Sequence, residues 1–238
     1  MVGLIIATAV VYPHDAALAR YDFLFLAAVV IQAGMLLFGL ETIDEAKVIL
    51  VYHVVGTVME VFKTAAGSWI YPEEALFRIA GVPLFSGFMY AAIGSYIARC
   101  FRMFDFQFSN YPRSSAPIGL AVAIYINFFS HHFIVDMRVA LLVSVVAIFG
   151  RTAVHYRVYR FRHRMPLVVG FLLVSLFIWI AENVGTLTRT WAYPNQQMGW
   201  QMVTLGKLGS WYLLMIVSFV LVTLVNRPQP HRPLPPPQ

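Results

Sequence analysis

Charged side chains are scarce in this sequence. Asp, Glu, Lys and Arg make up 12% of its 238 residues, whereas 60% of the residues are hydrophobic. An ordinary soluble domain is about one quarter charged, and the mean hydropathy of +0.72 also lies far from that class. The composition therefore excludes an ordinary soluble domain and predicts a polytopic membrane protein.

Cysteine is almost absent, and so is any basic segment at the start of the chain. The single cysteine, Cys100, cannot form an internal disulfide, so the redox compartment cannot be inferred. Residues 1–12 are apolar but lack the basic segment that opens a signal peptide. They are also shorter than the ~20 residues that a spanning helix needs. We expect a short or truncated first helix that ends at residues 13–15.

Longer apolar segments fill most of the remaining chain, and each is close to the ~20 residues that a span requires. They cover residues 21–40, 46–66, 82–100, 116–135, 138–156, 166–186 and 203–225. The predicted fold is all-α, a transmembrane bundle of seven full spans plus the short N-terminal helix, in a single domain over residues 1–226. The proline-rich tail, 227–238, is expected to be a solvated end of polyproline type.

Lysine and arginine are unevenly divided between the two sets of predicted loops. Eleven of the 17 fall on one set and six on the other. The richer side is expected to be cytoplasmic, which places the C-terminus inside. The basic run 157–164 then serves as a topology signal and a contact for anionic headgroups. The net charge of +6 accordingly predicts membrane lipids as partners, and no nucleic acid.

One polar stretch occurs twice, each time at the end of an apolar segment. The stretches are EVFKTAAGSWIYP (60–72) and ENVGTLTRTWAYP (182–194). They share Glu, Thr, Ser or Thr, Trp, Tyr and Pro in one register, which predicts a duplication with halves of about 1–112 and 113–226. Because an even number of predicted spans separates the copies, the halves should form a parallel repeat.

The glutamate of each copy lies inside a predicted span, where an ionisable group costs at least ~2.5–3.5 kcal/mol. Glu60 and Glu182 are therefore candidate catalytic or proton-carrying residues that face the bundle interior. The alternative is a structural clasp, in which each glutamate holds neighbouring backbone or a tyrosine.

We predict an interfacial aromatic belt for the tryptophans and tyrosines of the two stretches, and Lys207 is expected to snorkel. The candidate substrate-binding residues are His53, Lys63, Tyr90, Asn127, Asn183 and Arg189.

A third polar stretch, NFFSHHFIVDMR, covers residues 127–138. On a helix, Asn127 and His131 share one face, and His132 and Asp136 share the next. His131, His132 and Asp136 are candidate catalytic residues and could hold a divalent metal or a water. A zinc site needs three or four ligands, so interface histidines bonded to neighbouring helices are an equal alternative. The cofactor is left open, with a divalent metal as the candidate.

Three long segments resemble one protein family. MEVFKTAAGSWIYPEEALFRIAGVPLFSGFMYAAIGSYIAR, YINFFSHHFIVDMR and FIWIAENVGTLTRTWAYP are similar to the bacterial integral-membrane family catalogued as domain of unknown function 817, and the resemblance covers residues 12–225. It implies a multi-pass protein of the bacterial inner membrane with a fuller first helix. It implies no reaction.

Three functions are compatible with these residues. The first is a membrane-embedded enzyme for a lipid or isoprenoid-like substrate, with Glu60 and Glu182 as the acid–base pair. The second is a proton- or cation-coupled transporter of a small solute that uses the same glutamates at the repeat interface. The third is a structural or signalling membrane protein without catalysis. Sparse polar residues in the cytoplasmic halves of the spans disfavour a continuous route, so the enzyme leads slightly over the transporter.

Overall fold

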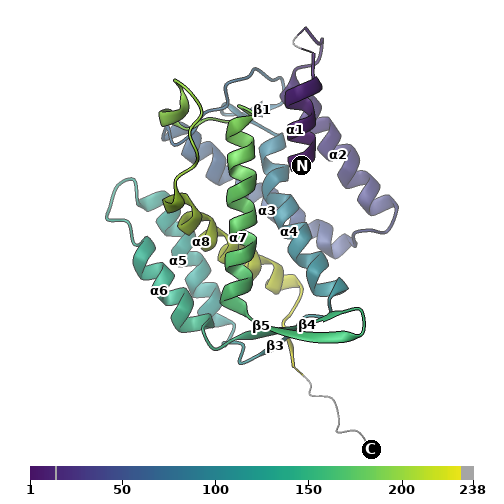
Figure 1. The fold of residues 1–238 in the computed structure, drawn as a ribbon, viewed down its shortest axis with the longest axis vertical. Coiled ribbons are helices and arrows are strands. Elements are labelled where there is room, and N and C mark those ends of the chain that lie inside the picture. Colours follow the sequence, from purple (N-terminus) through teal and green to yellow (C-terminus); the bar gives the residue numbers. More distant parts are fainter. Residues whose placement is uncertain (14, 232–238) are drawn as a thin grey trace, which may run out of the picture. The chain divides into compact units, whose positions relative to one another are not determined.

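The computed structural model describes residues 1–13 and 15–231 and is mostly helical (Figure 1). These residues divide into two compact units. Unit 1 holds Met1–Ser95 and Phe177–Lys207, and unit 2 holds Tyr96–Leu176 and the residues from Leu208 onward.

Eight α-helices lie within the described residues. They are α1 (Val2–Val11), α2 (Arg20–Leu37), α3 (Ile43–Ala65), α4 (Phe85–Met103), α5 (Ser115–Ser130), α6 (Arg138–Phe149), α7 (Leu167–Leu187) and α8 (Leu205–Val225). Each predicted apolar segment therefore contains one helix, and a short first helix is present. The predicted segment 138–156 is wrong beyond Phe149, because the chain leaves the helix there and a strand begins at Ala153.

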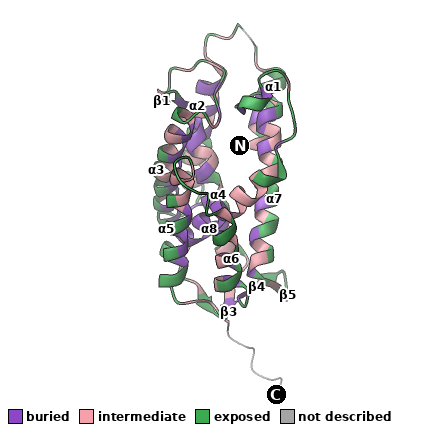
Figure 2. Ribbon diagram, turned by 90° about the vertical axis from the view of Figure 1, so that its left-hand side faces the viewer, coloured by how far each residue is buried: buried purple, intermediate pink, exposed green. Residues whose placement is uncertain are grey.

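Four helices, α2, α3, α7 and α8, are long and apolar enough to cross a membrane. Helices α1, α5 and α6 are apolar but contain only 10–17 residues. Exposed residues run along the helices in Figure 2, and they include large apolar side chains such as Val30, Val54 and Phe177. Apolar side chains on the outside of long helices suit contact with lipid. The chain is thus a membrane protein, whereas the predicted number of seven full spans is not confirmed.

The fold is mostly helical but also contains β-strands, which the all-α prediction did not include. In unit 2, β3 (Gln107–Ser109), β4 (Ala153–Val158), β5 (Phe161–Pro166) and β6 (Gln229–Pro230) form a sheet in the order β5-β4-β3-β6. Strands β3, β4 and β5 pair antiparallel, and β6 pairs parallel with β3. In unit 1, β1 (Arg78–Ile79) pairs with β2 (Val82–Pro83). The tail was expected to be solvated from residue 227, but β6 joins the sheet, and residues 232–238 lie outside the described part.

Unit 2 is built on an aromatic core. Phe149 on α6 contacts Phe171 on α7, with ring centroids 5.4 Å apart, and Phe171 contacts Phe219 on α8 at 4.9 Å. Phe108 on β3 lies 6.0 Å from Phe219 and ties the sheet to these helices. Such tilted and edge-to-face contacts are the favoured geometries of aromatic pairs.

In unit 1, glycines let α3 and α4 approach closely. A Cβ atom on Gly56 would lie 2.8 Å from the ring of Tyr90, and one on Gly94 would lie 2.6 Å from the ring of Tyr52. Each glycine thus receives an aromatic side chain of the facing helix. Small residues of this kind are typical of helix contacts in membranes, where close backbone approach supplies the packing energy.

The Gly94→Ala variant should be less stable by about 1–3 kcal/mol, because the added methyl group overlaps the ring of Tyr52. Gly34→Ala on α2 is the control, since no heavy atom lies within 4 Å of a Cβ there. Thermal unfolding in detergent micelles measures both. Equal unfolding temperatures for the two variants would contradict the close contact.

Candidate functional site

The two glutamates of the repeated stretches are both buried in unit 1. Glu60 lies on α3 with 3% of its surface exposed, and Glu182 lies on α7 with 7% exposed. An ionisable group in such surroundings needs hydrogen-bond donors or a counter-charge. The identity of its donors therefore decides what each carboxylate can do.

Glu60 is held by three hydrogen-bond donors of its own protein. Its Oε2 accepts hydrogen bonds from Trp69 Nε1 at 2.8 Å and from the Tyr71 hydroxyl at 2.7 Å. Its Oε1 accepts a third bond from the Tyr90 hydroxyl on α4 at 2.6 Å. Hydrogen bonds to a charged acceptor are stronger than neutral ones. We name Glu60 with Trp69 and Tyr71 the first clasp.

Glu182 repeats part of this arrangement. Its Oε1 accepts hydrogen bonds from Trp191 Nε1 at 2.9 Å and from the Tyr193 hydroxyl. These are the donors expected from the repeated register, and we name the three residues the second clasp. Both of these donors reach the same oxygen, Oε1, whereas the three donors of Glu60 are shared between its two oxygens. The two clasps are therefore alike in their tryptophan and tyrosine and unequal in the third donor.

Both clasps depend on the way the preceding helix ends. After α3, Gly67 has φ 68°, and the Ser68 N–H donates to the Lys63 carbonyl at 2.9 Å. After α7, Arg189 has φ 53°, and the Thr190 N–H donates to the Gly185 carbonyl at 2.9 Å. A left-handed residue followed by this bond is a common helix end that turns the chain back sharply. The turn directs each Trp-x-Tyr segment toward the glutamate of its own copy.

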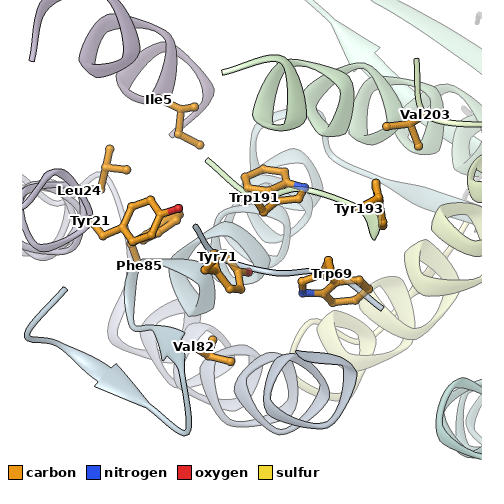
Figure 3. Close-up of a cluster of buried hydrophobic side chains, with 10 residues drawn as sticks. All are labelled: Ile5, Tyr21, Leu24, Trp69, Tyr71, Val82, Phe85, Trp191, Tyr193 and Val203. Carbon is orange, nitrogen blue, oxygen red and sulfur yellow. The ribbon is translucent and has the colours of Figure 1, made fainter. Parts of the chain in front are cut away.

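The two returning segments also bind each other. Ile70 and Ala192 form an antiparallel bridge, with N–H to carbonyl distances of 2.9 and 3.0 Å. Figure 3 shows the buried side chains on either side of this bridge, where Trp69 and Tyr71 lie near Trp191 and Tyr193. We name the two bridged segments, 68–72 and 190–194, the cap.

The predicted aromatic belt is wrong. Trp69, Tyr71, Trp191 and Tyr193 are 6–9% exposed, and each donates its N–H or O–H to a glutamate. A belt residue keeps its polar atom near the membrane surface, whereas these atoms point inward. The carboxylates need donors, and this need outweighs the general preference of such rings for an interface.

Two further side chains complete the surroundings of the cap. The Tyr21 hydroxyl on α2 donates to the Thr190 carbonyl at 2.7 Å, and the Tyr21 ring meets the Tyr71 ring edge-on at 6.2 Å. Lys207 Nζ on α8 lies 4.3 Å from the ring centroid of Tyr193 and 5.7 Å from that of Trp69. Lys207 therefore makes cation–π contacts with both copies, instead of only snorkelling to the surface.

The two carboxylates act on the same tyrosines. Burial raises the pKa of Tyr71 well above its usual range, and the charges of Glu60 and Glu182 raise it further. Burial also raises the pKa of Tyr193, and Glu182 and Glu60 again add to the effect. Both tyrosines lie in loops beyond the ends of α3 and α7. Their hydroxyls stay protonated at physiological pH and remain hydrogen-bond donors.

Of the predicted binding residues in unit 1, only Tyr90 contacts a glutamate through a bond described above. His53 packs edge-on against Phe88, with ring centroids 4.2 Å apart. Asn183 holds the loop before α8, since its Oδ1 accepts from the Val203 N–H at 2.9 Å. Lys63 is buried, whereas Arg189 is exposed and contributes its backbone to the turn. Sequence reasoning missed the four clasp aromatics as site residues, although their shared register was the available signal.

The residues of the third polar stretch belong to unit 2. Helix α5 ends at Ser130, so the helical spacing that would pair His132 with Asp136 does not apply. His131 Nδ1 instead lies 3.0 Å from the Asn127 carbonyl, and the two histidine rings lie 4.2 Å apart. Within the described residues, no group of three or more His, Cys, Asp or Glu is placed to hold a metal ion. His131, His132 and Asp136 thus do not form the predicted metal site in this structure.

Asp136 has its own partners. Its Oδ1 accepts from Asn127 Nδ2 at 3.1 Å and from the Arg138 backbone N–H at 2.9 Å, and the Arg138 guanidinium lies 3.1 Å from Oδ2. Partial desolvation would raise the pKa of Asp136, but the hydrogen bond from Asn127 and the contacts with Arg138 outweigh it and lower the pKa. This arrangement stabilises the turn between α5 and α6.

Comparisons with known proteins agree with the membrane fold. The family model described as "Protein of unknown function (DUF817)" matches residues 1–219. A Bacillus subtilis (strain 168) protein described as "Uncharacterized protein YoaT" is 46% identical over 216 residues, which cover 91% of this chain and 82% of that protein.

A crystal structure of MvINS, a mycobacterial Insig homolog from Mycobacterium vanbaalenii, is also similar. It matches with a TM-score of 0.56 and 14% identity, over 79% of this chain and 98% of MvINS. A cross-linked MvINS trimer gives the same values. At this identity the likeness shows the fold alone.

The Arg189→Gly variant should be more stable by about 1 kcal/mol, because a left-handed φ strains every residue that carries a Cβ atom. Gly67→Ala is the matched opposite at the same position of the first copy, where a Cβ would meet no atom within 4 Å, and it should lose a similar amount. Thermal unfolding measures both. A loss of stability in Arg189→Gly would show that contacts of the Arg189 side chain stabilise the protein more than the left-handed φ strains it.

Proposed function

The chain belongs to the DUF817 family of membrane proteins, and we propose that it serves as a structural or signalling membrane protein whose cap is closed by the two glutamate clasps. The observation that carries this proposal is the commitment of every clasp donor to a carboxylate. Two tryptophan N–H groups and two tyrosine O–H groups of the cap hold Glu60 and Glu182. Carboxylates whose described donors all belong to the protein itself are suited to fixing the two cap segments, 68–72 and 190–194, in place.

Glu60 is poorly placed for catalysis. A general acid or base must come within hydrogen-bond reach of a substrate proton, but Glu60 already accepts three hydrogen bonds from Trp69, Tyr71 and Tyr90. A carboxylate offers about four lone-pair sites. Three of them are occupied, and because only 3% of Glu60 is exposed, a substrate has little access to the remaining one. Glu60 therefore acts as the anchor of the first loop.

Glu182 supports a second candidate function. Its two clasp donors, Trp191 and Tyr193, both bond to Oε1, and the ammonium group of Lys207 lies over the ring of Tyr193. A buried carboxylate with two donors on one oxygen and a nearby cation is what acid–base chemistry on a lipid or isoprenoid-like substrate would use. A proton- or cation-coupled carrier would use the same group. In either case Glu182, and not Glu60, is the reactive residue.

We extend the proposal to the membrane topology. The chain would cross a bacterial inner membrane seven times with its C-terminus in the cytoplasm, and its halves would be related by duplication. Two observations support the duplication: the same donors hold both glutamates, and Ile70 pairs antiparallel with Ala192. A two-fold axis along the membrane normal reverses any segment that crosses it, so it would produce this antiparallel pairing between parallel repeats.

The Glu60→Gln variant should lose about 2–4 kcal/mol of stability, because a neutral amide accepts hydrogen bonds more weakly and its NH2 group faces donors. Glu182→Gln should lose less, about 1–2 kcal/mol, since its carboxylate accepts two such bonds. Glu74→Gln, on the exposed part of the first loop, is the control and should match the wild type. Thermal unfolding in micelles gives the ranking.

A Glu60→Gln protein as stable as the wild type would overturn the clasp as the role of Glu60. If Glu182→Gln loses more stability than Glu60→Gln, the hydrogen bond from Tyr90 does not add to the stability of the first clasp. The proposal that Glu60 is the stronger anchor would then be wrong. A host phenotype lost in Glu182→Gln at unchanged stability would favour the second candidate function.

A further inference from the structure

A β-hairpin in unit 2 emerges from the start of a membrane-crossing helix. Strands β4 and β5 pair along their whole length and are joined by Tyr159 and Arg160, with Tyr159 at φ 55°. Strand β5 ends at Pro166 and α7 begins at Leu167, with no residue between them. Helix α7 is one of the four helices that are long and apolar enough to cross a membrane. The base of the hairpin is therefore fixed to the end of a span.

One face of this hairpin is basic. The register places Arg157 opposite Arg162 and His155 opposite Arg164. Directly opposite residues share a face of the sheet, and positions two apart on a strand share it as well. These four side chains thus gather on one side, which we name the basic face. Like charges placed directly opposite each other are destabilising unless an anion lies between them.

The protein itself supplies little negative charge to the basic face. Asp105 pairs with Arg162 at 2.8 Å. Among the described residues, no carboxylate forms an ion pair with Arg157 or Arg164. The neighbouring charges also disfavour a further cation, because burial lowers the pKa of His155 and the charges of His231, Arg164 and Arg162 lower it further. At least two guanidinium groups are therefore available to an external anion.

The tip of the hairpin exposes apolar and aromatic side chains around Arg160, whose guanidinium lies 5.3 Å from the ring centroid of Tyr159. Val158 lies opposite Phe161, and the exposed fractions of Val158, Tyr159 and Phe161 are 44%, 80% and 70%. The same hairpin thus joins an apolar tip to a cationic face. Aromatic side chains next to cations are typical of segments that lie at the surface of a bilayer.

We propose that this hairpin binds the phosphate groups of anionic phospholipids, with Arg157, Arg162 and Arg164 as the binding residues. Guanidinium groups fit phosphate oxygens with two parallel hydrogen bonds. The choice of a lipid over free phosphate rests on the position of the hairpin and its tip: the base continues into a membrane span, and exposed Tyr159 and Phe161 would enter the headgroup layer.

The test compares the full chain with two double variants of equal charge loss. Arg157→Gln/Arg164→Gln removes two cations of the basic face and leaves the Arg162–Asp105 pair intact. Arg113→Gln/Arg151→Gln removes two exposed arginines outside the hairpin. The proteins are placed in nanodiscs that contain phosphatidylcholine with increasing phosphatidylglycerol, and native mass spectrometry measures which lipids stay bound. A third protein, Arg157→Lys/Arg164→Lys, keeps the two positive charges. It shows whether lipid loss in the glutamine variant comes from the lost charge or from a hairpin that no longer folds.

The hairpin variant should retain phosphatidylglycerol at least about tenfold less than the wild type, given that each basic residue near an anionic surface contributes about fivefold. The outside variant should bind as the wild type does, and the lysine variant should keep most of the binding. Equal losses in both glutamine variants would overturn the proposal, because only net charge would matter. Loss of bound phosphatidylglycerol in millimolar inorganic phosphate, at constant ionic strength, would also overturn it, since the site would then take free phosphate.

Discussion

A carboxylate buried in an apolar helical bundle must be given donors, and the structure of unit 1 follows from this requirement. Glu60 obtains its donors from Trp69, Tyr71 and Tyr90. To deliver the first two, the chain has to turn back directly after α3, and Gly67 in a left-handed conformation makes that turn. The loop is thus positioned by the glutamate and by the buried cluster in which Trp69 and Tyr71 also pack.

The second copy of the stretch repeats this solution and brings the two loops together. Ile70 and Ala192 complete the contact through their backbones. The copies differ where the third donor stands: Tyr90 serves Glu60, whereas near Glu182 the facing group is Lys207, stacked on Tyr193. Glu60 thus has three donors on its two oxygens, whereas the two donors of Glu182 share one oxygen, and this difference is the basis for proposing Glu60 as the anchor.

Sequence patterns predicted the helices and both glutamates, because long apolar segments and the repeated register are local signals. They offered a glutamate clasp on a tyrosine only as the alternative to a functional site, and they assigned the tryptophans and tyrosines to an interfacial belt, since a belt and a buried donor use the same residues, Trp and Tyr. The helical spacing of His132 and Asp136 failed because α5 ends before them. The β4–β5 hairpin was missed because its arginines resemble a cytoplasmic loop, although alternate positions of β4 carry Val154, Tyr156 and Val158. The clasps and the His132–Asp136 pair both depend on the residue at which a helix ends, which apolar spacing alone does not specify.

The central claim is that the two clasps form one energetically coupled cap. A double-mutant cycle with Tyr71→Phe and Tyr193→Phe tests it most directly, because each substitution removes one hydroxyl and leaves the ring in place. The unfolding free energies of the two single variants and the double variant, measured in the same micelles, give the coupling. The account predicts a coupling of about 0.5–3 kcal/mol, as for residues in one network. Additive losses, within about 0.3–0.5 kcal/mol, would show that the two clasps act separately.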